Sequence, residues 1–215
     1  LQLSGQGSSW TAHSMEIGAG SIGSLELHDG ASFTTGEGTA SIAYGPFGGN
    51  LLVDNASASF PEGLVLNPKS YSDNSSLLIT HGGSVDTGNN PMDAIFNSSE
   101  ITIENGLLTS ASFRTGPGTQ TLRIGPAGEL HLTDALGDDT MADFLSHAIS
   151  DYGNLSLQVW DGSGYTNYTE LTEGVDYAVS DGTLHAVPEP SQSRMILLAS
   201  TVATMLIPLT RKRRN

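Results

Sequence analysis

Residues 77–83 read LLITHGG and residues 101–106 read ITIENG, and each is a short alternating apolar run followed by a tight-turn signal. Alternation with a period of two places every second side chain on the same face of a β-strand. Glycine and asparagine tolerate the positive φ that a sharp turn requires. Runs of this kind begin at five positions, separated by 26, 26, 24 and 21 residues: Leu25, Leu51, Leu77, Ile101 and Leu122.

A repeat of twenty to thirty residues made of strands and turns is typical of a solenoid. The sequence therefore predicts an all-β fold in which residues 1–134 form a right-handed parallel β-helix. Leu, Ile and Val are expected to point inward as ladders, while Thr, Ser and Glu point outward. A β-sandwich built of antiparallel hairpins explains the same alternation and is the alternative fold.

The pattern changes over residues 135–186, which we expect to form a small α+β cap on the solenoid. Asp138, Asp139 and Thr140 can begin a short helix, since carboxylates and hydroxyls satisfy the first helical N–H groups. Strands are expected at residues 155–160, 175–179 and 183–187, the last two joined by an Asp-Gly turn. The apolar face of the helix is expected to contain Met141, Phe144, Leu145, Ala148 and Ile149.

Charge is distributed very unevenly along the 215 residues. Residues 1–190 contain three basic and 23 acidic residues, a formal charge of −20, whereas the tail contains five basic residues and no acidic one. A body this acidic repels phosphate, so nucleic acid is excluded as a partner. The absence of cysteine excludes disulfides and thiolate chemistry. No secretory signal pattern follows Leu1, so any export signal is expected upstream.

Residues 195–210 form an uncharged run, MILLASTVATMLIPLT, which predicts a short transmembrane helix. Sixteen residues span about 24 Å as a helix, against a hydrocarbon core of about 30 Å. A basic cluster follows directly and should stay cytoplasmic, so that residues 1–190 face outward. The cluster consists of Arg211, Lys212, Arg213 and Arg214.

The segment before this run contains two prolines one residue apart, which favours an extended and accessible chain. It comprises Val187, Pro188, Glu189 and Pro190. This segment, the apolar run and the basic cluster together resemble the PEP-CTERM sorting signal of Gram-negative, biofilm-forming bacteria. The resemblance covers residues 187–215. It implies that an exosortase, a membrane-embedded processing enzyme, recognises the Pro-Glu-Pro element and removes the tail; a permanent membrane anchor is the alternative.

Catalytic motifs are lacking, and no two of the six histidines have a metal-ligand spacing. We therefore expect neither an enzyme nor a protein with a cofactor or metal. Trp160, Tyr165 and Tyr168 form a candidate glycan-binding cluster, with core packing as the alternative interpretation. The expected function is a structural or adhesive protein at the cell envelope or in the extracellular matrix. The alternatives are a carbohydrate-binding module and a polysaccharide-active β-helix enzyme.

Overall fold

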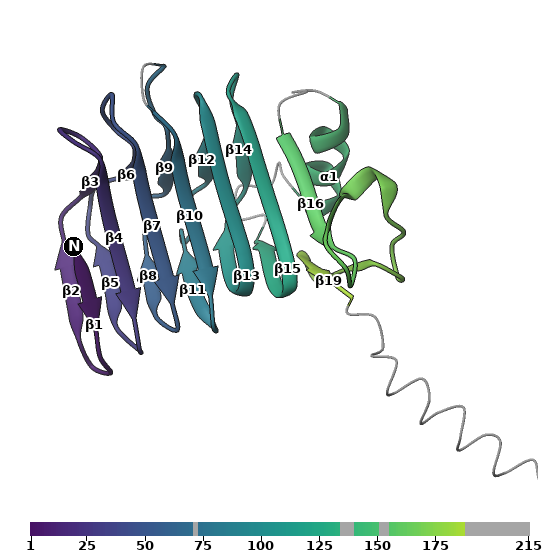
Figure 1. The fold of residues 1–215 in the computed structure, drawn as a ribbon, viewed down its shortest axis with the longest axis horizontal. Helices are drawn as coiled ribbons and strands as arrows, with labels where there is room; N and C mark the ends of the chain where they lie inside the picture. The colour runs from purple at the N-terminus through teal and green to yellow at the C-terminus, as the bar shows by residue number, and fades with distance from the viewer. Residues whose placement is uncertain (71–72, 134–139, 151–154, 188–215) are drawn as a thin grey trace, which may run out of the picture.

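The computed structural model describes residues 1–70, 73–133, 140–150 and 155–187. These residues form a parallel β-solenoid of about five turns, followed by a single short helix and a group of short strands (Figure 1). The coils stack through parallel strand pairs, which excludes the antiparallel β-sandwich. The predicted transmembrane helix at residues 195–210 lies outside the described residues.

Each coil contributes to three faces. The first face contains β1 (Gln2–Ser4), β4 (Gly23–His28), β7 (Gly49–Asp54), β10 (Ser75–Thr80), the beginnings of β13 (Ser98–Ser110) and β15 (Thr119–Leu132), and β16 (Leu155–Trp160). The second face contains β2 (Ser9–Ala12), β5 (Ser32–Thr35), β8 (Ser57–Ser59), β11 (Gly83–Asp86) and the ends of β13 and β15. The third face contains β3 (Met15–Ile17), β6 (Ala40–Ile42), β9 (Leu64–Leu66), β12 (Met92–Ala94) and β14 (Phe113–Thr115).

The register of the first face confirms the repeat predicted from the sequence. Leu25 pairs with Leu51, and Leu51 with Leu77. The ladder continues from Leu77 to Ile101 and from Ile101 to Leu122. All five side chains are buried. Side chains alternate between the two sides of a strand, so residues at the same register position of every strand point inward. The 26-, 26-, 24- and 21-residue spacings are therefore the lengths of successive coils.

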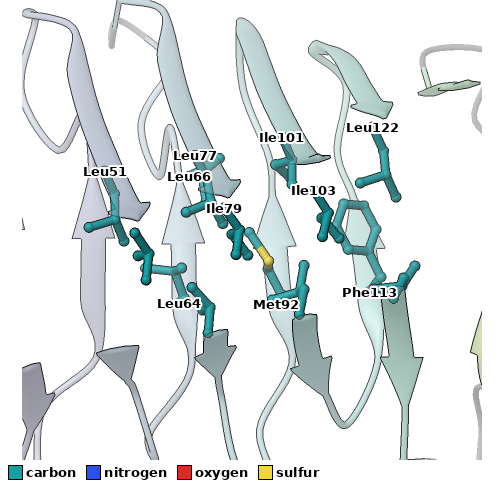
Figure 2. Close-up of a cluster of buried hydrophobic side chains, with 14 of the residues drawn as sticks. Leu51, Leu64, Leu66, Leu77, Ile79, Met92, Ile101, Ile103, Phe113 and Leu122 are labelled. Atoms are coloured by element: carbon teal, nitrogen blue, oxygen red, sulfur yellow. The ribbon is translucent and has the colours of Figure 1, made fainter. Parts of the chain in front are cut away.

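The core lies between the three faces and is mostly aliphatic (Figure 2). Leu66 of the third face lies beside Leu77 of the first, and Met92 of the third face lies beside Ile79 of the first. All four side chains are no more than 1% exposed. Burial on this scale contributes roughly 1.5–3 kcal/mol for each large aliphatic side chain, so this core is the main source of stability.

The corner between the first and second faces is a tight turn with a left-handed residue. Asp29, Asn55 and His81 occupy this position in three successive coils, with φ of 55°, 48° and 49°. Small residues follow because adjacent coils approach closely there. A Cβ added at Gly106 would lie 2.4 Å from the carbonyl oxygen of Gly83, well inside contact distance.

The helix α1 (Met141–Ser150) begins with a capping box. Thr140 Oγ1 accepts a hydrogen bond from the Asp143 N–H at 3.2 Å, and Asp143 Oδ2 accepts one from the Thr140 N–H at 3.2 Å. The predicted helix is thus confirmed; Asp138 and Asp139 lie outside the described residues. Met141, Phe144 and Leu145 are buried as expected. Phe144 packs edge-on against Phe113 of β14 at 5.5 Å, so α1 continues the third face beyond its last strand.

The remaining strands close the C-terminal end of the solenoid. β16 pairs in parallel with β15, whereas β19 (Thr183–Ala186) joins β15 antiparallel on the second face. β18 (Tyr177–Ser180) forms a hairpin with β19 through Asp181 and Gly182, both with positive φ, as the Asp-Gly signal predicted. β18 begins two residues later than the predicted strand at 175–179. The other hairpin joins β16 to β17 (Tyr165–Asn167), and the 3₁₀ helix η1 (Tyr168–Glu170) follows it.

Candidate functional site

The β16–β17 hairpin brings together two of the three predicted glycan-binding residues. Trp160 and Tyr165 are directly paired across the antiparallel strands. Their ring centroids lie 5.5 Å apart with the planes at 81°, an edge-to-face contact. This geometry is favourable for an aromatic pair, but it does not make the two rings one flat surface.

The turn of this hairpin is held by Asp161. Its Oδ1 accepts hydrogen bonds from the backbone N–H groups of Ser163 and Gly164 at 2.8 and 3.0 Å, and from the Ser163 hydroxyl at 2.8 Å. Its Oδ2 accepts one from Thr166 Oγ1 at 2.6 Å. These donors, led by Thr166, hold the pKa of Asp161 far below its usual range. Asp161 therefore stays ionised and fixes the turn; it is unsuited to proton transfer.

Arg123 connects the aromatic pair to the outer surface of the first face. Its guanidinium lies 5.7 Å from the centre of the Tyr165 ring, and its Nε donates to Gln158 Oε1 at 3.0 Å. It also forms an ion pair with Glu100. Burial, with a contribution from Glu104, raises the pKa of the Tyr165 hydroxyl. We call Glu100, Arg123, Gln158, Trp160 and Tyr165 the Trp160 patch.

Tyr168 takes part in a different contact. Its ring lies 5.0 Å from that of Tyr177, and the Tyr177 hydroxyl donates to the Tyr168 oxygen at 3.4 Å. Tyr177 is buried, and burial raises the pKa of its hydroxyl strongly. Tyr168 thus packs against the end of the core, as Trp160 also does, but its aromatic partner is Tyr177 and it is not part of the Trp160 patch.

A histidine–carboxylate chain crosses three coils at the corner after the first face. His28 Nδ1 and His81 Nδ1 are hydrogen-bonded to opposite oxygens of Asp54, at 3.1 and 2.7 Å. The bond to His81, more than any other contact, lowers the pKa of Asp54. This cluster was not predicted from the sequence, because its members lie on three different coils and each histidine was considered alone. The signal was present: the three residues are separated by 26 and 27 positions, close to one coil.

Other expected sites fall partly or wholly outside the described residues. Val187 is half-buried, and its N–H donates to the Asp176 carbonyl oxygen at 2.9 Å, so the chain is still attached to the cap there. The rest of the sorting motif and the basic cluster are outside the described ranges. Within those ranges, no helix is long and apolar enough to cross a membrane, and no group of three histidine or carboxylate residues is arranged to hold a metal ion.

Comparison of the chain with protein-family models, with curated proteins and with solved structures finds no match. Inferences about function therefore rest on the geometry and the sequence of this chain alone.

Proposed function

We propose that this chain is an exported structural or adhesive protein of the cell envelope or extracellular matrix. In this proposal residues 1–186 are a rigid acidic spacer, and residues 187–215 are a sorting tail processed by an exosortase-type membrane enzyme. The observation that carries the proposal is the joining of a continuous solenoid body to a tail of opposite charge. The coils are inferred to wind right-handedly, as crossovers between parallel strands nearly always do.

A solenoid suits a spacer role because each coil is held by its neighbours through backbone hydrogen bonds and a shared core. Its length grows by one strand spacing, about 4.7–4.9 Å, for every coil. The strong negative charge of the body keeps it soluble and separate from its own copies outside a cell. A role of this kind needs no catalytic group, and it uses the surface of the coils only for contact.

The sorting role is tested by following the protein in its native host. Intact mass and C-terminal peptide mapping of the protein from membranes and medium should give a mature chain that ends near Pro190. Glu189→Ala should keep the full chain in the membrane fraction, while Glu173→Ala, an exposed cap residue, should be processed normally. Recovery of only the chain ending at Asn215 from the host would mean a permanent anchor and would overturn the sorting proposal.

A second candidate function, carbohydrate binding, is favoured by the Trp160 patch. Its two rings supply apolar contact area, and Gln158 and Arg123 supply hydrogen-bonding groups beside them. Trp160→Ala should abolish binding to a glycan array while the thermal unfolding curve remains cooperative. Trp10→Ala provides the matched control, because Trp10 is 42% exposed on β2, in the first coil. Equal binding by both variants would dismiss this candidate.

A further inference from the structure

The outer side of the first face presents a row of side chains that runs along the solenoid from β4 to β16, strands that lie side by side (Figure 1). These residues stand between two inward ladders, since neighbouring positions of a strand point to opposite sides. The strand register joins them from coil to coil in the order Glu26, Leu52, Leu78, Thr102, Arg123 and Gln158. We call these six residues the middle row. It begins inside the Trp160 patch, because Arg123 and Gln158 belong to both.

A second row, made mostly of hydroxyl and amide groups, runs beside the middle row. Its members, paired by the same register, are Ser24, Asn50, Ser76, Glu100, Thr121 and Ser156. The Ser76 hydroxyl donates to Asn50 Oδ1 at 2.7 Å, which holds two of these side chains in place. Leu52 and Leu78 stand in the same two strands and are half-buried. Each leucine therefore leaves an apolar surface next to fixed hydrogen-bonding groups.

The two rows together, which we call the outer strip, are open to solvent within the described part of the chain. All twelve residues lie in the described ranges and are exposed or half-buried. The described elements beyond the coils pack elsewhere, since α1 continues the third face and β19 joins the second. The strip is formed by strands alone, so the backbone ladder fixes its shape before any ligand binds.

We propose that the outer strip binds a linear, uncharged polysaccharide that lies along the solenoid axis with one end on the Trp160 patch. This proposal rests on the carbohydrate-binding candidate and extends it from one patch to six strands. Adjacent strands are about 4.7–4.9 Å apart, close to the sugar-to-sugar repeat of an extended pyranose chain, so about one sugar would lie over each strand. A pyranose has an apolar face and polar edges, which suits leucine surfaces beside hydroxyl and amide groups.

Charge favours a neutral glycan over an anionic one and over a second copy of this chain. Arg123 is the one cation in the outer strip, and it is already paired with Glu100. Glu26 lies at the far end of the middle row, and the body around the strip is strongly acidic. An anionic polysaccharide, or the same face of another copy, would therefore be repelled.

Isothermal titration calorimetry on the purified full chain in detergent compares cellohexaose, chitohexaose and laminarihexaose with their disaccharides. At least one hexasaccharide should bind, and its disaccharide, which covers only one end of the strip, should bind at least ten-fold more weakly. Leu78→Ala should weaken hexasaccharide binding at least three-fold and leave disaccharide binding unchanged, because Leu78 lies three strands away from Trp160. Trp160→Ala should weaken the binding of both lengths.

Leu107→Ala is the matched control, because Leu107 is a half-buried leucine on the second face and should bind as the parent does. Circular dichroism should show the same thermal unfolding for both leucine variants. Hexagalacturonate, the anionic probe, should bind at least ten-fold more weakly than the neutral hexasaccharide.

Equal affinity for a hexasaccharide and its disaccharide would overturn the outer strip and leave the Trp160 patch as a short site. Parent-like binding by Leu78→Ala, a loss in Leu107→Ala as large as that in Leu78→Ala, or equally tight binding of hexagalacturonate would overturn the proposal too. If no hexasaccharide binds at millimolar concentration, the strip falls together with the carbohydrate-binding candidate. The sorting proposal is tested separately by the mass of the mature chain, so its failure is distinguishable from all of these results.

Discussion

The coil body, residues 1–133, and the cap, residues 140–187, are built on different principles. In the body, one arrangement repeats, and each inward position is occupied by a similar aliphatic residue in coil after coil, as in the ladder from Leu25 to Leu122. In the cap, no arrangement repeats from one layer to the next. It consists of a capped helix, two different hairpins and a pair of packed tyrosines. The body gains stability from repetition, whereas the cap depends on individual side-chain hydrogen bonds and aromatic contacts.

If stability in the body comes from stacked coils, the position of a residue along the stack should determine how much its truncation lowers the free energy of unfolding. Ile103 in β13 has neighbours on both sides, since β13 pairs with β10 and β15. Ile17 in β3 belongs to a strand that pairs, among the described residues, with β6 alone. Ile103→Ala should lower the free energy of unfolding by about 4 kcal/mol, and Ile17→Ala by about 2 kcal/mol, because a buried cavity is costlier than one that solvent can reach.

Urea denaturation followed by circular dichroism measures both values. The two variants delete the same atoms, so their difference reports only the environment. In the structure the Ile17 side chain is 6% exposed and the Ile103 side chain is not exposed at all. Equal losses of stability would contradict this difference, because they would mean that the first coil is as well enclosed as the centre of the stack.

Sequence reasoning succeeded where a physical signal repeats. The ladder was predicted because apolar residues recur at coil spacing, and the Asp181–Gly182 turn because that dipeptide strongly favours a two-residue hairpin. The third face was not predicted, because strands of three residues are too short to show alternation. The histidine–carboxylate chain was missed because its members meet only after the coils stack. Tyr168 was grouped with Trp160 by closeness in sequence, although packing directs it toward Tyr177.

A smaller effect is expected from the start of the cap helix. Thr140→Ala removes the hydroxyl that accepts the Asp143 N–H and should cost about 1 kcal/mol. The loss should be local, because α1 is joined to the body mainly through its buried face. Hydrogen exchange should therefore accelerate in the first turn of α1 and remain unchanged at β7 and β10. Glu173→Ala, at an exposed position of the cap outside the helix, serves as the control. Uniform acceleration throughout the body would mean that cap and coils unfold together.

The smallest effect concerns pH, and it contrasts the two strongly hydrogen-bonded aspartates. Asp161 in the cap is held by hydroxyl and backbone donors that do not titrate. Asp54 in the body is held by two histidines, and its lowered pKa means that the ionised carboxylate favours the folded chain. That contribution is complete above the ordinary value of 3.8 and disappears as the pH falls through the lower folded value.

Asp54→Asn should therefore destabilise the protein at pH 6, by less than about 1 kcal/mol because the side chain is 30% exposed and screened by water. The variant and the parent should come to unfold at the same urea concentration as the pH falls through the lowered folded pKa of Asp54, since the parent carboxyl is then protonated as well. His81→Asn should reproduce most of the pH 6 loss, because the His81 bond is the largest cause of the lowered pKa. The double variant should add little to either single one. Fully additive losses would show that Asp54 and His81 act independently, and that the histidine–carboxylate chain does not tie the coils together.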